Sequence, residues 1–257
     1  MSTQSKQEFL TLYEVIRIVE TIPVFLEDHL DRLYHSAKLT GTDHLMPDFS
    51  PMKGIIKNYI STQNKNTGNI KLSFSFNSTS DTPHSELTFI PHYYPTQSEY
   101  SEGVKVGLLN ADRPVPHAKI RHSDIRERAD DSIKNEGLSE VLLVDSEGNI
   151  TEGSRSNVFF IKNDILYSAP EEKVLQGITR IKVVQLCHEA GIRITETTIP
   201  ATNLNQYEAA FLTGTSIKVL PIRSVGAQIF RTDLPLLVTL QDLYNLAIDN
   251  YLRENLQ

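Results

Sequence analysis

The sequence predicts an α+β protein with mixed sheets in two unequal halves. Alternating apolar segments typical of strands occur along the chain, and several longer stretches carry apolar residues at helical spacing. A doubly wound parallel sheet would require strands and helices to alternate regularly, and in this sequence they do not. With 257 residues, 39% of them hydrophobic and 22% charged, the chain can bury one large core or two modest ones without disulfides.

The N-terminal half is expected to form a small α+β domain of residues 1–110. Its expected elements are a strand at 10–19, helices at 25–39 and 52–60, and strands at 69–76, 86–90 and 104–109. The polar stretch 78–85 predicts the hairpin loop between two of these strands.

The stretch 111–117 contains two prolines and is expected to link this domain to a larger C-terminal domain of residues 118–257. In the larger domain, Gly137 and Gly191 are typical of helix ends. The expected elements are helices at 123–135, 177–190 and 233–252, strands at 140–144, 157–162, 192–196 and 209–213, a strand ending at 151, and a loop at 214–221.

Charge and composition argue against several classes of protein. The net charge of −7 and a pI near 5.6 disfavour binding to nucleic acid through phosphate contacts. No apolar run reaches transmembrane length, and the N-terminus lacks the apolar segment of a secretion signal. The single cysteine, Cys187, excludes a disulfide framework, and the 8 histidines show no metal-ligand spacing. We therefore expect a cytoplasmic protein with no metal, no membrane contact and no nucleic-acid partner.

Three windows of the C-terminal half carry groups that suit an anionic ligand. Residues 177–180 open a helix, so the first-turn amides and the Thr179 hydroxyl converge where a phosphate is stabilised. Residues 213–216 offer further hydroxyl and amide donors, and Glu152 is followed by glycine and serine between two strands. Each window alone is typical of an ordinary helix cap or turn, but together they suggest a phosphate-binding site.

Taken in order, these windows resemble the class IV aminotransferases, also called fold-type IV pyridoxal 5'-phosphate (PLP) enzymes. The motifs are TEG-S-x-SN-F from residue 151, GITR from residue 177 and TGT from residue 213, before a proline. The similarity runs from Tyr13 to about Val225. It implies PLP as the cofactor and a fold like that of D-amino acid aminotransferase, with a smaller N-terminal α/β sandwich and a larger C-terminal pseudo-barrel domain.

The resemblance also implies roles for residues near the ring of PLP. Lys119 stands at the head of the helix that follows the linker, at the family spacing before Glu152, and would carry the cofactor as a Schiff base. Lys105 and Lys134 do not fit this spacing. Glu152 would pair with the pyridine nitrogen and keep it protonated, which makes the ring an electron sink. Tyr13 would line the active site near the lysine and the substrate.

Other residues are expected to hold the phosphate and the substrate. Arg32 matches the phosphate-binding arginine of the family, and its fork of donors suits a dianion. Ile178 would contribute its backbone amide and Thr179 its hydroxyl. Thr215 and Ser216 match the loop that contacts the phosphate and the substrate carboxylate.

The expected function is transfer of an amino group between an amino acid and a 2-oxo acid by a homodimeric enzyme with small-molecule substrates. Two alternatives stay open: a 4-amino-4-deoxychorismate lyase of the same fold, which eliminates pyruvate, and a PLP-binding protein without catalysis. Three departures from the family pattern bear on this choice. His122 replaces the usual asparagine, a Gly-Asp-Gly run is missing before Tyr13, and the strand that begins near Lys71 lacks an Arg-x-His pair.

Overall fold

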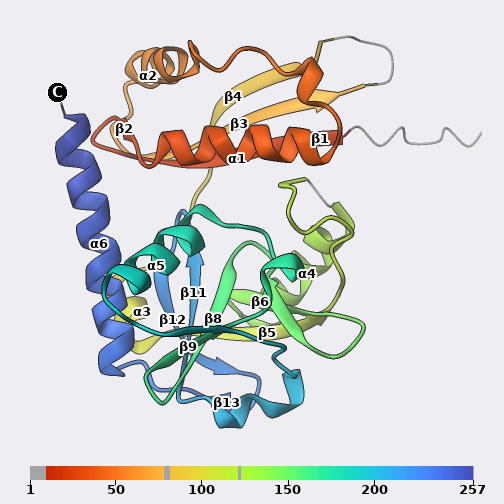
Figure 1. Cartoon of the computed structure of the whole chain (residues 1–257), viewed down its shortest axis with the longest axis vertical. Coiled ribbons are helices and arrows are strands. Elements are labelled where there is room, and N and C mark those ends of the chain that lie inside the picture. Colours follow the sequence, from red (N-terminus) through yellow and green to blue (C-terminus); the bar gives the residue numbers. More distant parts are fainter. Residues whose placement is uncertain (1–9, 78–81, 121–122, 257) are drawn as a thin grey trace, which may run out of the picture. The chain divides into compact units, whose positions relative to one another are not determined.

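The structure is a computed structural model that describes residues 10–77, 82–120 and 123–256. Contacts along the chain divide it into two compact units (Figure 1). Unit 1 takes the chain up to Pro91 and again at Ala118–Arg121, whereas unit 2 takes His92–His117 and the chain from His122. Part of the expected loop at 78–85, the polar N-terminus and the position of His122 lie outside the described residues.

The division between the units differs from the linker expected at 111–117. Strand β5 (Val104–Asn110) pairs with β12 (Lys218–Val225) and with β6 (Glu140–Val144), so it belongs to unit 2. Strand pairing is decided by partners far along the chain, which a proline-rich stretch cannot indicate. The break therefore follows Pro91, and Ala118–Arg121 returns to unit 1.

Unit 1 is an antiparallel sheet in the order β2-β1-β3-β4 with two helices (Figure 1). Alternate residues of β1, among them Leu12, Ile16 and Ile18, are buried in one core with Leu33 and Ile56 of the helices. The expected elements of this unit are confirmed. Their bounds are β1 (Leu10–Val19), β2 (Ile22–Pro23), α1 (Leu26–Leu39), η1 (Asp43–Leu45), α2 (Met52–Thr62), β3 (Gly68–Phe76) and β4 (His84–Ile90).

Unit 2 is built on a curled, mixed sheet in the order β10-β9-β8-β11-β12-β5-β6-β7, with β13 beside β12 (Figure 1). One apolar core includes Leu142, Val158, Leu212 and Ile222 from four of these strands. The further strands are β7 (Ile150–Gly153), β8 (Asn157–Lys162), β9 (Ile165–Ser168), β10 (Ile194–Glu196), β11 (Ala209–Gly214) and β13 (Gln228–Ile229). The helices are α3 (Gln97–Glu102), α4 (Ser123–Glu136), η2 (Glu171–Lys173), α5 (Ile178–Glu189), η3 (Ala201–Gln206) and α6 (Pro235–Asn255).

Strand β12 is the main element that the sequence did not indicate. A loop is expected at 214–221, whereas β12 begins at Lys218 and contains Pro221. Proline has no N–H to donate to a ladder and therefore argues against a central strand. Here β5 pairs with β12 only from Ile222 onward, so Pro221 lies before that ladder begins.

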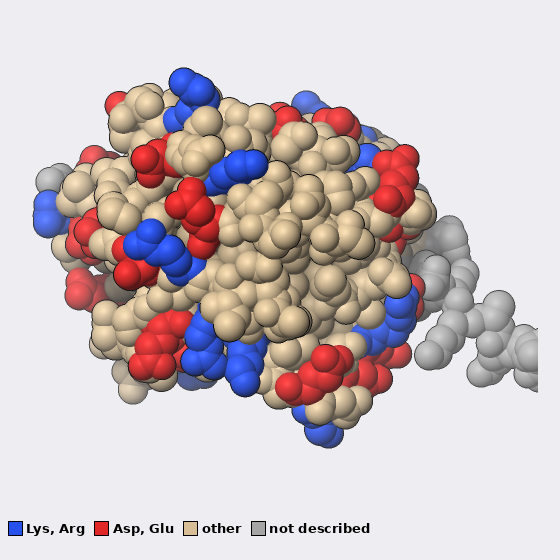
Figure 2. Space-filling view, turned by 90° about the horizontal axis from the view of Figure 1, so that it is seen from below, with Lys and Arg blue, Asp and Glu red and all other residues tan. Residues whose placement is uncertain are grey.

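The surface carries mixed charges. Figure 2 shows one face of the molecule, on which acidic and basic side chains alternate around a wide uncharged area. Within the described parts of the chain, no helix has both the length and the apolar character needed to span a bilayer.

Candidate active site

Lys119 is fixed in unit 1 by its own backbone. Its carbonyl accepts a hydrogen bond from the Tyr13 N–H at 3.3 Å, and its N–H donates to Ser36 Oγ of α1 at 3.2 Å. The next residue, Ile120, forms an antiparallel bridge with Leu12. The Lys119 Nζ lies 4.9 Å from the centre of the Tyr13 ring. The structure thus brings together the amine and the aromatic ring that the sequence singled out.

A buried ion pair connects β1 to α1 next to this lysine. Arg32 donates from Nε to Glu14 Oε1 at 2.7 Å and from Nη2 to Glu14 Oε2 at 2.6 Å. His29 Nδ1 lies 2.7 Å from the same Oε2, and all three side chains are buried. Two parallel hydrogen bonds fix the plane of a guanidinium, so Glu14 determines the orientation of the Arg32 guanidinium. The sequence identified Arg32 but gave no sign of its two partners.

The electrostatics of this cluster make it a charged pair with a neutral histidine. Burial alone would raise the pKa of Glu14, but Arg32 and His29 outweigh it and hold the pKa at about 2. Burial lowers the pKa of His29, and the charges of Arg32 and Lys119 act in the same direction against the opposing effect of Glu14. His29 is therefore neutral near pH 7.

We expect this cluster to make unit 1 acid-sensitive. A group whose pKa is lowered by folding stabilises the fold above its unfolded pKa, and that contribution is lost as the pH falls. The loss should begin below about 6.5 for His29 and continue below 4.5 for Glu14. In urea titrations from pH 7 to pH 5, the His29→Gln variant should lose less stability than the wild type. Equal losses in the two proteins would contradict this account.

In unit 2, Glu152 is a buried carboxylate at the end of β7. Its Oε2 accepts from Asn157 Nδ2 and from the Leu175 N–H, each at 3.1 Å, and Arg113 Nε lies 2.8 Å from its Oε1. These donors replace the water that burial removes. Arg113 also donates from Nη2 to the Ser154 carbonyl. The sequence missed Arg113 because it stands beside a proline in the stretch taken as a linker, where a charged residue is ordinary.

A second buried carboxylate shapes the turn after Glu152. Glu140 of β6 accepts from Ser154 Oγ at 2.6 Å and Ser156 Oγ at 2.9 Å, and also from two backbone N–H groups. A Cβ on Gly153 would lie 2.1 Å from Ser156 Oγ, so this tight turn requires glycine there. Both serines of the TEG-S-x-SN-F motif are thus engaged in holding the turn between β7 and β8.

The start of α5 lies close to Glu152 through Asn157. Gly177 is the N-cap of α5, and a Cβ at that position would lie 2.2 Å from Asn157 Oδ1. Ile178 and Thr179 follow in the first turn, and both are buried. The Thr179 hydroxyl has a partner within the protein, Tyr244 Oη of α6, at 3.1 Å. The first-turn amides of α5 are thus the groups of this window that best suit an anion.

Thr215 and Ser216 lie in a three-residue turn between β11 and β12, where Gly214 pairs with Lys218. Lys218 has a left-handed backbone with φ of 54°. The turn meets the β7–β8 turn, because a Cβ on Gly214 would lie 3.9 Å from the Arg155 carbonyl. Within unit 2, Glu152, the start of α5 and the turn of Thr215 and Ser216 therefore lie near the end of β7, the start of β8 and the end of β11.

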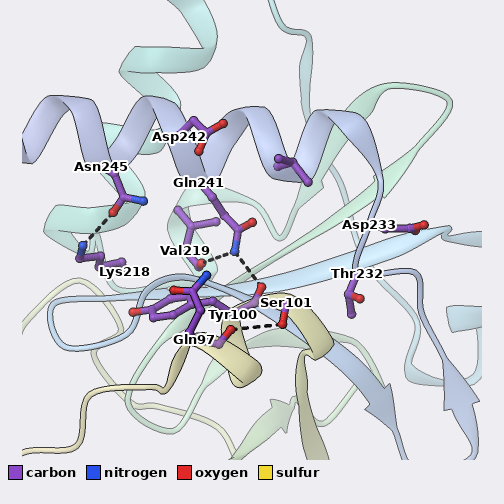
Figure 3. A pocket seen from close by; sticks show the side chains of 11 residues that line it. Gln97, Tyr100, Ser101, Lys218, Val219, Thr232, Asp233, Gln241, Asp242 and Asn245 are labelled. Carbon is purple, nitrogen blue, oxygen red and sulfur yellow. Dashed lines mark hydrogen bonds between the residues drawn. The ribbon is translucent and has the colours of Figure 1, made fainter.

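The turn is supported from behind by α3 and α6, around a cavity of about 460 Å³ (Figure 3). Tyr100 Oη of α3 donates to the Ile217 carbonyl at 3.1 Å, and Lys218 Nζ donates to Asn245 Oδ1 at 2.7 Å. Gln241 Nε2 of α6 donates to the Tyr100 and Val219 carbonyls. These bonds within the wall of the cavity hold the turn in position.

Comparison with known proteins bears on this arrangement. Residues 11–225 match the family model of the amino-transferase class IV proteins. The chain is 28% identical over 239 residues to D-alanine aminotransferase of Bacillus licheniformis, a match that covers 87% of this chain and 82% of the relative.

Solved structures show the same fold. A crystal structure from Legionella pneumophila, provisionally named a 4-amino-4-deoxychorismate lyase, matches with a TM-score of 0.82, 21% identity and 96% of each chain covered. The PLP-bound form of a hypothetical aminotransferase from Mycobacterium tuberculosis matches with a TM-score of 0.77, 18% identity, and 93% of this chain and 89% of that chain covered. At these identities the likeness shows the fold alone, and the predicted two-domain α+β fold is confirmed.

Proposed function

Because the chain belongs to the class IV aminotransferases, which are enzymes that use PLP, we propose that it transfers an amino group between an amino acid and a 2-oxo acid. The observation that carries the proposal is the position of Lys119. Its backbone is bonded to β1 and α1, and its Nζ lies 4.9 Å from the centre of the Tyr13 ring. A lysine held in this way can carry an aldehyde cofactor and then move a substrate proton.

The residues present fit PLP by their chemistry. Unit 1 supplies the amine of Lys119, and unit 2 supplies the buried carboxylate of Glu152 and the first-turn amides of α5. Gly177 leaves the start of α5 without a side chain, where a Cβ would meet Asn157. When bound, PLP supplies an electron-withdrawing ring that stabilises negative charge at the substrate carbon.

Each residue then has a defined task. Lys119 would hold the cofactor. Once released, its amine would take the proton from the substrate Cα and donate it to the C4' atom of the cofactor. Glu152 would hold the ring nitrogen in its protonated form, oriented by Asn157 and Arg113. Arg32, with its plane set by Glu14, would bind the phosphate. The other phosphate and substrate ligands would be Ile178, Thr179, Thr215, Ser216 and Tyr13.

The alternative is the lyase reaction, and strand β3 gives a specific reason to keep it. Ser73 lies opposite Tyr13 in the sheet, and Lys71 lies 5.5 Å from the Tyr13 ring. Strand β3 thus offers the amine of Lys71 and the hydroxyl of Ser73, where D-amino acid aminotransferases have the Arg-x-His pair that holds a carboxylate. Lysine is a compact point charge and does not make the paired bonds of an arginine.

Two assays on the PLP-loaded enzyme separate these functions. We expect that single amino acids convert the bound cofactor to pyridoxamine phosphate and that a 2-oxo acid reverses the conversion. Pyruvate released from aminodeoxychorismate without any acceptor would instead select the lyase. A cofactor spectrum that no substrate changes would argue for a PLP-binding protein without catalysis.

We also propose that the enzyme is a cytoplasmic homodimer with small-molecule substrates. The family resemblance is the main support. The wide uncharged area in Figure 2 is compatible with a subunit contact. The only cysteine of the chain, Cys187 on α5, is buried, as expected for a protein that does not depend on disulfides.

A further inference from the structure

Thr213 of β11 carries a buried hydroxyl with no hydrogen-bond partner among the described residues. Its side chain is only 1% exposed, and its Oγ1 has no donor or acceptor within reach. Buried hydroxyl groups in folded proteins are nearly always hydrogen-bonded, because an unpaired one costs free energy. Valine would fill the same space without that cost. The hydroxyl therefore suggests a partner that binds from outside the chain.

The register of the sheet shows where this hydroxyl lies. Thr213 stands directly opposite Asn157 of β8, so the two side chains are neighbours on one face. Asn157 is the residue that bonds Glu152 and the Leu175 carbonyl. Asn157 thus stands between Thr213 and the carboxylate that we assign to the cofactor ring.

The same face is covered by the start of α5. Phe211, two residues before Thr213, stacks on Phe159 with ring centres 5.2 Å apart, and Arg180 of α5 lies 5.9 Å from the centre of the Phe159 ring. Thr213 therefore faces the side of the sheet that α5 covers, lies beside Asn157, and comes just before the turn that contains Thr215 and Ser216. These are the elements whose amides and hydroxyls suit a phosphate.

Two polar groups of this part of unit 2 already have other partners. The Asn157 amide donates to Glu152 and to Leu175, and the Thr179 hydroxyl is bonded to Tyr244. We propose that the Thr213 hydroxyl donates a hydrogen bond to a phosphate oxygen of bound PLP. The sequence placed Thr213 in a window that suits an anion but assigned the phosphate contact there only to Thr215 and Ser216. This inference rests on the proposed function, because it assumes that unit 2 binds the phosphate of PLP.

The test compares the Thr213→Val and Thr213→Ser variants with the wild type. For each apoprotein we would measure the melting temperature, and then the dissociation constants of PLP and of pyridoxal, which lacks the phosphate. Thr213→Val should leave the melting temperature of the apoprotein unchanged or raised, since it removes only an unpaired hydroxyl. Thr213→Val should raise the dissociation constant of PLP about tenfold and leave that of pyridoxal nearly unchanged. Thr213→Ser should retain tight PLP binding.

Three results would overturn the inference. One is unchanged PLP affinity in Thr213→Val, as expected if the hydroxyl bonds only an isolated water. Another is an equal rise in the dissociation constants of PLP and pyridoxal. The third is a clear fall in the melting temperature of the Thr213→Val apoprotein, which would give the hydroxyl a structural role. Failure of the wild type to bind PLP would be a different result, and it would contradict the proposed function itself.

Discussion

Replacing Lys119 with alanine should remove both turnover and the visible absorbance of the lysine-bound cofactor. Lys119 is the residue to which we assign the covalent link, and the same amine is needed to move the proton, so turnover should fall by roughly 10³ or more. The fold should survive, because the backbone of Lys119 makes the hydrogen bonds to Tyr13 and Ser36. Absorption spectra and steady-state rates of the purified variant measure both effects.

Lys71 provides the matched control. Its Nζ lies 5.5 Å from the centre of the Tyr13 ring, against 4.9 Å for Lys119, so both amines approach the same side chain in unit 1. The Lys71→Ala variant should retain the absorbance, whatever its effect on the choice of substrate. If the Lys119→Ala protein kept the spectrum and Lys71→Ala lost it, the assignment would have to move to Lys71.

Replacing Glu152 with glutamine should produce the second large effect, a fall in turnover of roughly 10² to 10³. Glutamine has nearly the same shape but no charge to keep a ring nitrogen protonated. The change also leaves Arg113, whose side chain is 16% exposed, beside a neutral group. Breaking such a pair should cost about 2–4 kcal/mol of unfolding free energy. Steady-state kinetics and urea titration measure the two effects separately.

Two further variants separate chemistry from stability. In Glu152→Gln combined with Arg113→Met, the unpaired cation is gone, so stability should recover in part while turnover stays low. Glu140→Gln removes another buried carboxylate of unit 2, one that bonds the turn at Ser154 and Ser156. It should lose stability yet retain more turnover than Glu152→Gln. Turnover of Glu152→Gln within threefold of the wild type would refute the role of this carboxylate.

Much of the fold could be predicted from the sequence because local patterns carry it. The alternation of apolar residues in β1 reflects one face that packs on α1 and α2, and it fixes both the strand and its buried side. The boundary between the units could not be predicted in this way. It depends on β5 pairing with β6 and β12, which are distant in sequence, and on the return of Ala118–Arg121 to unit 1.

The candidate site shows a similar limit. Motif residues such as Glu152 and Thr215 stand out because their neighbours have a recognisable order. The alternation of β1 puts Glu14 on the buried side with Leu12 and Ile16, but only the fold shows that Arg32 and His29 are its partners. Thr213 belongs to the TGT motif, yet its buried, unbonded hydroxyl emerges only from the packing of β8, β11 and α5.

The central claim is that Lys119 carries the cofactor, and chemical reduction tests it most directly. Treating the PLP-loaded wild-type enzyme with borohydride converts the lysine–cofactor link to a stable adduct, which peptide mass spectrometry can locate. We predict a single adduct on the peptide that contains Lys119. An adduct on Lys71 or any other lysine, with Lys119 unmodified, would contradict the account.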